Sequence, residues 1–412
     1  MSLAIFGGTP IREKPFPVWP QPTRDIEDEV LKCLHGENWG IGSKVVDRLC
    51  ESFSNYHDSD FAIATNSGTT ALWVALKAAG LKAGDEVIVP AYTFIATASS
   101  VLMANGIPVF ADIDINTGNI DPNSVKEKIT DRTRMIIPVH IGGTPCDLDS
   151  LRSIAESNNL TIIEDAAQAH GAEWDRKKVG AIGTGGCFSF QTSKNMAAGE
   201  GGIIISNDEQ FMDSCFSYHN CGRVRSGGWY EHNHLGGNFR ISAIQAALLI
   251  PQLKTLDHFL KVRESNRKIL ESSISHIDGI STLQTLPKVT RSANHIFICR
   301  YDEKQFNGIS RDTFFKAMQA EGIYTYQGYK PLYKENLFII DSSEYPWLRD
   351  VDYRNISLPC TERLCEKESI WLKQNYLLGS PEDTQDVINA FEKVTSAMKA
   401  EPNLFLDRDK NN

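Results

Sequence analysis

The stretch Thr161–Gly202 reads TIIEDAAQAHGAEWDRKKVGAIGTGGCFSFQTSKNMAAGEGG, and it decides how the chain is organised. It begins with a short apolar run that ends in two carboxylates, Glu164 and Asp165. A second run, Cys187–Phe190, follows a pair of glycines and leads to Lys194 and a Gly-rich turn. Short apolar runs bounded by glycine and polar residues are typical of buried strands. The stretch therefore predicts two strands of an α/β sheet, each followed by a loop.

An acid and a lysine follow these two strands, and functional side chains in open α/β sheets gather where strands end. We therefore expect Asp165 and Lys194 to reach one crevice. Such a pair suits pyridoxal 5'-phosphate (PLP), because a lysine forms the Schiff base and a carboxylate keeps the pyridine nitrogen protonated. Taken singly, a lysine is usually a solvated charge and an aspartate at a strand end is usually a cap. Together with Ser189 and the Gly-rich exit, they favour a cofactor site.

The segments EDAAQAHGA and SFQTSKNMAAGEGG resemble the signature of the DegT/StrS-type sugar aminotransferases, which are PLP enzymes of fold type I. The resemblance implies that Asp165 contacts the pyridine nitrogen and that Gln168 lies near the phenolic oxygen of the cofactor. It also implies that Ser189 holds the phosphate and that Lys194 is the Schiff-base residue. Because the motif is long, chance agreement is a poor explanation.

Composition sets further limits. The chain has 412 residues, 41% of them hydrophobic, and a formal net charge of −10. This length suits about two domains of ~100–200 residues each, and the acidic balance argues against a nucleic-acid or anionic membrane partner. No apolar run approaches the ~20 residues of a membrane helix, and the first twenty residues do not resemble a signal peptide. The nine scattered cysteines predict reduced thiols in a cytoplasmic protein rather than disulfides or zinc ligands.

A second candidate for phosphate binding precedes the deciding stretch. The strand Phe61–Thr65 is followed by Asn-Ser-Gly-Thr-Thr and then by apolar residues at helical spacing. A small, Gly-containing turn at a helix N-terminus presents free N–H groups and the positive dipole end to an anion. An ordinary N-cap would explain the turn equally well by itself. Beside Ser189 and Lys194, phosphate binding through Gly68 and Thr69 becomes the better interpretation, and the family has the same S-G-T element.

Two further residues follow predicted strands. The resemblance places Phe94 at the position of an aromatic that stacks on the PLP ring, and a flat π-face suits that contact. A core phenylalanine is the competing interpretation. His140 ends another strand at the same edge of the sheet, so it either approaches the site or has a structural role.

The alternation of strands and helices predicts a parallel, right-handed αβα sandwich. The further strands are expected at 85–90, 108–112, 134–140 and 202–206, and helices at 25–35, 122–129, 256–274 and 312–321. With the resemblance, the expected fold is the PLP-dependent transferase fold type I: a large αβα domain with a mainly parallel sheet and a smaller C-terminal α+β domain. We expect an N-terminal arm (1–25), a large PLP-binding domain (26–250) and a small domain (251–412).

The segment GGNFRISAIQAA resembles a family motif whose asparagine reaches the cofactor phosphate of the other subunit. Asn238 occupies that position, which implies a homodimer with shared active sites. The glutamate usual in this motif is absent, with Ala243 in its place, so any contact made by that carboxylate is lost or moved. Read alone, Asn238 would be a helix cap.

The resemblance implies ping-pong transamination, with Lys194 as the general base and glutamine or glutamate as the amino donor. The segments LAIFGGTPIREKPFPVWPQ, SYHNCGR and WLKQNYLLG resemble the branch of glutamine:scyllo-inosose aminotransferases and 3-amino-5-hydroxybenzoate synthases. A keto cyclitol or keto sugar of antibiotic biosynthesis is therefore the expected acceptor. Alternatives are a lyase like 3-amino-5-hydroxybenzoate synthase and an aminotransferase for nucleotide-linked keto sugars. A PLP-dependent dehydratase or a non-enzymatic binding module fits poorly, because Lys194 is present.

Overall fold

The computed structural model describes residues 2–36, 38–228, 230–341 and 343–409. Its centre is a seven-stranded sheet in the order β1-β9-β8-β5-β4-β2-β3. The strands are β1 (Phe61–Thr65), β2 (Glu86–Pro90), β3 (Ile107–Ala111), β4 (Thr133–Ile136), β5 (Thr161–Asp165), β8 (Gly185–Ser189) and β9 (Gly202–Ser206). The predicted strands are therefore confirmed, although β4 ends earlier than expected. Pro138 explains the early end, because proline cannot donate to the ladder.

The sheet is mainly parallel, as predicted, but not wholly so. The pairs β2–β3, β2–β4, β4–β5 and β5–β8 are parallel, whereas β9 runs antiparallel to both β8 and β1. A parallel neighbour would need a long crossover, whereas the loop after β8 turns the chain straight back into β9. Lys194 lies in that loop, so the same loop that reverses the chain direction also positions the lysine.

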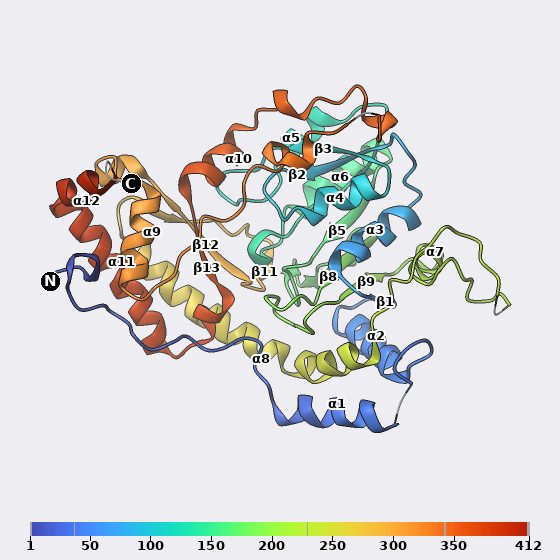
Figure 1. The fold of residues 1–412 in the computed structure, drawn as a ribbon. Helices are drawn as coiled ribbons and strands as arrows, with labels where there is room; N and C mark the ends of the chain where they lie inside the picture. The colour runs from blue at the N-terminus through green and yellow to red at the C-terminus, as the bar shows by residue number, and fades with distance from the viewer. Residues whose placement is uncertain (1, 37, 229, 342, 410–412) are drawn as a thin grey trace.

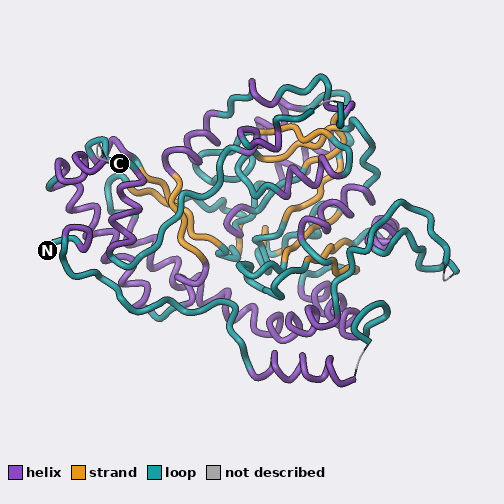
Figure 2. Tube along the Cα trace, viewed as in Figure 1, coloured by secondary structure: helices purple, strands orange, loops and turns teal. Residues whose placement is uncertain are grey.

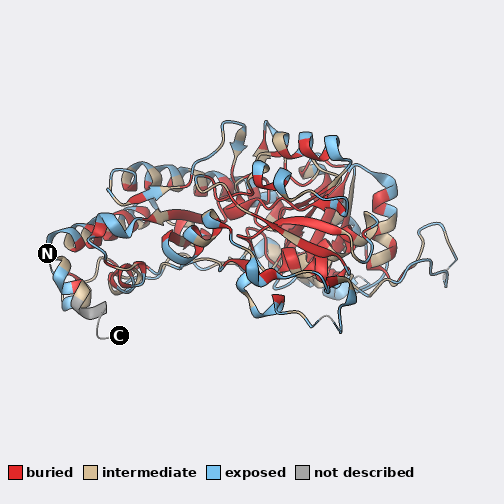
Figure 3. Cartoon of the chain, turned by 90° about the horizontal axis from the view of Figure 1, so that it is seen from above, coloured by how far each residue is buried: buried red, intermediate tan, exposed pale blue. Residues whose placement is uncertain are grey.

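Helices cover both faces of the sheet, so that the sheet and the two sets of helices form three layers (Figures 1 and 2). The helices of the large part are α2 (Lys44–Tyr56), α3 (Gly68–Ala78), α4 (Ala96–Met103), α5 (Pro122–Lys128), α6 (Leu148–Asn158) and α7 (Glu209–His219). Along β9, Ile203 and Ile205 pack in a cluster with α2 and α6, whereas Ile204 packs with α3, α4 and α7. Because successive side chains of a strand point to opposite faces of the sheet, the apolar residues of β9 contribute to the hydrophobic cores on both faces. Figure 3 shows the buried strands between their helices.

The long helix α8 (Ala243–Ile274) links the large sheet to a smaller one (Figure 1). The sequence predicted a helix that opens after Asn238 and a separate long helix from Leu256 to Ile274, whereas the structure joins them into one helix. Pro251 lies inside the helix and obscured the pattern, while a capping box of Ser242 and Gln245 fixes the true beginning. The expected domain boundary at residue 250 falls within this helix, so the proposed division assigns its first turns to the large domain.

The second part of the molecule is an antiparallel sheet of β10 (Ile280–Thr282), β12 (Ile296–Tyr301) and β13 (Ser369–Lys373). It packs with α9 (Arg311–Ala320) and α11 (Pro381–Ala400) around a separate core. The N-terminal and C-terminal segments both lie at this part of the molecule (Figures 1 and 3). The helix α1 (Arg24–Gly36) lies along α8 (Figure 1). In the part of the chain that is described, no helix is both long and apolar enough to cross a membrane.

Candidate active site

Asp165 and Lys194 follow neighbouring parallel strands, as predicted. Asp165 is the last residue of β5 and pairs in register with Cys187 of β8, and Lys194 lies in the loop after β8. Asp165 is buried, and two donors hold its carboxylate: Thr97 Oγ1 at 2.7 Å and the backbone N–H of Ala167 at 3.2 Å. Thr97 was missed, because nothing in a helical segment indicates that one hydroxyl faces a distant strand end.

Burial shifts the pKa values of Asp165 and Lys194 in opposite directions. It raises the pKa of Asp165, while the bonds from Thr97 and Ala167 and the charge of Lys194 oppose the rise. It lowers the pKa of Lys194 to about 8, and the charge of Asp165 opposes the fall. A lysine amine that titrates near pH 8 is available as a base or nucleophile close to neutral pH.

The N-terminus of α3 faces Ser189, the last residue of β8. Ser67 caps the helix by accepting a hydrogen bond from the N–H of Thr70 at 3.1 Å. A Cβ atom added to Gly68 would lie 2.8 Å from the Cβ of Ser189, so only glycine allows this approach. The first N–H groups of a helix have no partner within it, so those of Gly68 and Thr69 face the serine hydroxyl region together with the positive end of the helix dipole. This cradle fits a phosphate.

Gln168 is buried in the loop that follows β5. Its Oε1 accepts a hydrogen bond from the N–H of Gly142 at 2.7 Å, and its Nε2 donates to the hydroxyl of Tyr329 at 3.1 Å. Phe94 stands open, with 54% of its surface exposed, and its ring centroid lies 6.4 Å from that of Tyr329. An exposed phenylalanine is not a core residue, so that competing interpretation of Phe94 is excluded. Tyr329 was not predicted as a site residue.

His140 has a structural position. Its Nδ1 accepts from the N–H of Cys146 at 3.3 Å, so the proton lies on Nε2, which contacts Glu164 Oε2 at 3.1 Å. Glu164 also accepts hydrogen bonds from the backbone N–H groups of Gly180, Ile182 and Gly183. Both side chains are fully buried. The pair therefore anchors the loop before β8 to β5, which holds the two strands in place.

Asn238 is exposed, and no hydrogen bond of its side chain is found among the described residues. Its backbone forms a bridge with Asn220, and the carbonyl of the next residue, Phe239, accepts from the N–H of Asn66 at 2.7 Å. The segment thus lies beside the turn that begins α3. Within one chain, however, the Asn238 side chain is not brought to Ser189.

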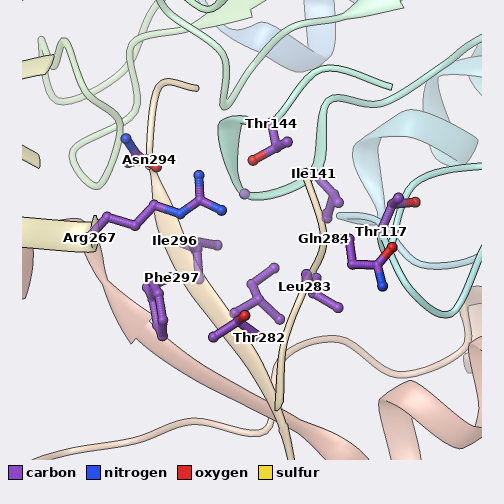
Figure 4. A pocket seen from close by; sticks show the side chains of 12 residues that line it. Thr117, Ile141, Thr144, Arg267, Thr282, Leu283, Gln284, Asn294, Ile296 and Phe297 are labelled. Atoms are coloured by element: carbon purple, nitrogen blue, oxygen red, sulfur yellow. The ribbon is translucent and has the colours of Figure 1, made fainter. Parts of the chain in front are cut away.

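A cavity is lined by residues of η2 (Ile141–Gly143) and of the small sheet (Figure 4). Its lining includes Thr117, Thr144 and Arg267. Asp165 and Lys194 are not among the lining residues of this cavity. The residues around Asp165 and Lys194 fit PLP, since a phosphate cradle at Gly68 and Ser189, a buried carboxylate and a lysine with a lowered pKa lie at or after the ends of neighbouring strands.

Comparisons with known proteins agree with this geometry. Residues 20–372 match the DegT/DnrJ/EryC1/StrS aminotransferase family. A Streptoalloteichus tenebrarius protein named "Putative L-glutamine:3-amino-2,3-dideoxy-scyllo-inosose aminotransferase" is 38% identical, covering 95% of this chain and 97% of its own. The L-glutamine:2-deoxy-scyllo-inosose aminotransferase of Streptomyces lividus is 34% identical, with 95% and 97% covered.

Solved structures give the same result for the fold. The aminotransferase of Psychrobacter cryohalolentis superposes with a TM-score of 0.85 at 30% identity, covering 93% of this chain and all of that chain. The structure of 3-amino-5-hydroxybenzoic acid synthase superposes with a TM-score of 0.82 at 29% identity, covering 93% and 99%. The predicted type I fold, the predicted family branch and the predicted cofactor are confirmed. The chain is a PLP-dependent aminotransferase and belongs to the DegT/DnrJ/EryC1/StrS aminotransferase family.

Proposed function

We propose that this enzyme transfers the amino group of L-glutamine to a keto cyclitol of the scyllo-inosose type. The observation that carries the proposal is the alignment along nearly the whole chain with relatives named for that donor and that class of acceptor. The relative that is 38% identical is named for the 3-amino-2,3-dideoxy acceptor, so this cyclitol is the first candidate. Such an activity belongs to aminocyclitol antibiotic biosynthesis.

Lys194 and Asp165 are proposed to carry the chemistry. Bound PLP supplies a ring that withdraws electrons from the carbon that loses its proton. Lys194 Nζ would hold the cofactor, and once the amino group of the donor takes its place, the freed neutral amine of Lys194 would accept the α-proton of the donor. The Asp165 carboxylate holds a proton on the pyridine nitrogen, and Thr97 and Ala167 keep that carboxylate oriented.

The other predicted residues are proposed to bind the cofactor. Ser189 Oγ and the N–H groups of Gly68 and Thr69 bind the phosphate at the N-terminus of α3. Phe94 presents its exposed ring to the pyridine, which explains why a phenylalanine remains uncovered. Gln168 Nε2 donates to the hydroxyl of Tyr329 and is proposed to face the phenolic oxygen of the cofactor.

We further propose a homodimer in which Asn238 of each chain serves the cofactor phosphate of the other. Large apolar side chains are exposed on α1, in the loop that follows it and in the loop before α8; they include Leu31, Leu34, Trp39, Ile41, Tyr230 and Leu235. Exposed apolar surface of this extent supports an interface. Cytoplasmic location and the division into residues 1–25, 26–250 and 251–412 remain parts of the proposal.

A half-reaction screen tests the substrate. The enzyme, converted to its pyridoxamine form with glutamine, is mixed with the 3-amino-2,3-dideoxy and 2-deoxy derivatives of scyllo-inosose, with scyllo-inosose itself and with nucleotide-linked keto sugars. The cyclitol ketones should restore the PLP absorbance fastest. Faster turnover of a nucleotide-linked sugar would overturn the assignment, and aromatised product would indicate the lyase activity that the similarity to 3-amino-5-hydroxybenzoic acid synthase suggests.

A further inference from the structure

We propose that Trp19, Gln374 and Arg263 form a clamp that positions the main chain of the catalytic lysine. Trp19 Nε1 donates to the carbonyl of Lys194 at 2.7 Å, and Gln374 Nε2 donates to the same carbonyl at 3.1 Å. Gln374 Nε2 also donates to the carbonyl of Ser193 at 2.7 Å. Trp19 lies in the N-terminal arm, whereas Gln374 begins η9 (Gln374–Leu378) directly after β13. Two segments that lie far from the lysine in sequence therefore hold one peptide unit of its loop.

Arg263 fixes the orientation of the glutamine amide. Its Nη2 donates to Gln374 Oε1, and its guanidinium carbon lies 5.0 Å from the centre of the Trp19 ring. A guanidinium has donors and no acceptor, so Gln374 must present its oxygen to Arg263. The amide nitrogen is then forced toward the carbonyls of Ser193 and Lys194. One buried cation thus orients both donors of the clamp.

The burial of Arg263 argues against a purely structural origin for this arrangement. Its side chain is fully buried, and its Nε and Nη1 atoms have no hydrogen-bond partner among the described residues. A buried guanidinium with unmatched donors is costly, and a hydrophobic residue would serve packing better. The free-energy cost of burying Arg263 is explained if the reaction needs Gln374 in this orientation.

The clamp matters because Lys194 lies on a hairpin loop and reaches the reacting carbon through a flexible stem. Inside the loop, the N–H of Lys194 donates to the carbonyl of Gln191 at 2.8 Å. The clamp restrains the other side of the same residue, because it holds the carbonyl of Lys194. A shift of about 1 Å in a reacting group can cost on the order of 100-fold in rate. Trp19, Gln374 and Arg263 are positioning residues, because they act through Lys194.

The inference rests on the proposed Schiff-base role of Lys194, so borohydride reduction and peptide mapping come first, in the wild type and in each variant. The key variant is Gln374→Glu. It keeps an oxygen for Arg263, now as an ion pair, but replaces the amide donors by an oxygen that repels the two carbonyls. We expect an unchanged or higher Tm, kcat lowered about 10- to 100-fold, and KM for glutamine within about twofold of the wild type. PLP capture by the cofactor-free protein, followed by absorbance, should slow as well.

Two further variants test the contribution of Trp19 to the clamp. Trp19→Phe keeps a ring over Arg263 and against Phe259 but removes one N–H, so kcat should fall about 2- to 10-fold. The matched control is Trp174→Phe, which removes an indole hydrogen bond to Asp149 and should leave kcat unchanged. A Gln374→Glu protein that is labelled on Lys194 and has wild-type kcat and capture rates would overturn the clamp alone. Labelling of another lysine in the wild type would overturn both the clamp and the proposed role of Lys194.

Discussion

At the scale of single residues, burial sets the chemistry of the crevice. The same dry environment raises the pKa of Asp165 and lowers that of Lys194 to about 8. Desolvation disfavours both charged forms, whereas their mutual attraction and the hydrogen bond from Thr97 preserve the carboxylate. The site therefore presents a buried carboxyl group to the pyridine nitrogen and an amine that loses its proton easily. Two predictions follow from these shifts.

Asp165→Asn should separate cofactor binding from catalysis. The amide keeps the shape of the side chain and can still accept from Thr97, so the protein should retain PLP through Ser189 and Lys194. Without the negative charge the ring nitrogen loses its proton, and transamination should slow by orders of magnitude. Absorbance measures retained PLP, and single-turnover mixing with glutamine measures the rate. A variant with nearly wild-type transamination would mean that another group protonates the ring.

The pH dependence of lysine labelling tests the lowered pKa of Lys194 directly. Only the neutral amine reacts with an acylating reagent, so in the cofactor-free protein labelling of Lys194 should rise with pH to a half-maximal rate near pH 8. An exposed lysine reaches that point only near pH ~10.4. Because the charge of Asp165 raises this pKa, Asp165→Asn should move the midpoint to lower pH. A midpoint of Lys194 equal to that of exposed lysines in the same digest would contradict the burial argument.

At the scale of elements, the sequence predicted what local patterns encode. Short apolar runs gave the strands, and strand ends gave Asp165, Ser189 and Lys194. The apolar pattern of β9 did not indicate its direction, because a buried strand has the same pattern in either direction. The continuity of α8 was missed because Pro251 lies within a helix that tertiary packing sustains. Contacts that join distant segments, such as Thr97 to Asp165 and Trp19 to Lys194, leave no periodic pattern in the sequence.

The N-terminus of α3 provides a prediction at this scale. Gly68→Ala places a methyl group 2.8 Å from the Cβ of Ser189, so the helix end must move away from β8. We expect unfolding to become easier by about 1–3 kcal/mol and PLP affinity to fall, because the phosphate cradle opens. Adding Ser189→Gly should restore stability but not affinity, since the clash is relieved while the hydroxyl is lost.

The control for this variant is Gly36→Ala, at the end of α1, where an added Cβ meets no atom within 4 Å. Urea unfolding measures stability, and equilibrium dialysis measures PLP affinity. If Gly68→Ala binds PLP as tightly as Gly36→Ala, the N-terminus of α3 does not hold the phosphate.

At the scale of the whole molecule, buried histidines predict acid sensitivity. Burial lowers the pKa of His57 to about 3, and those of His170 and His295 also lie well below the usual value. Between pH ~6.5 and ~3 the unfolded chain therefore binds protons that the folded chain does not, so stability falls as the pH falls. For His57 alone the loss between pH 7 and pH 5 is about 2 kcal/mol.

His57→Gln should remove that share of the pH dependence, whatever its effect on stability at pH 7. The measurement is the free energy of unfolding in urea at both pH values. The exposed His35→Gln variant, in the last turn of α1, should lose as much stability on acidification as the wild type does. Equal losses for His57→Gln and wild type would mean that His57 is already charged in the folded protein.

The assembly itself can be tested through Asn238, whose exposed side chain finds no hydrogen-bond partner among the described residues of its own chain. A hydrogen bond to the partner's cofactor phosphate contributes about 1.5–3 kcal/mol, so its loss should weaken PLP retention about tenfold or more. Asn238→Asp goes further, because its carboxylate repels the phosphate. When inactive Lys194→Ala chains exchange with Asn238→Asp chains, one site of each mixed dimer collects both lesions and the other collects neither, so activity should return. If subunit exchange is confirmed and activity stays absent, each site is built within a single chain.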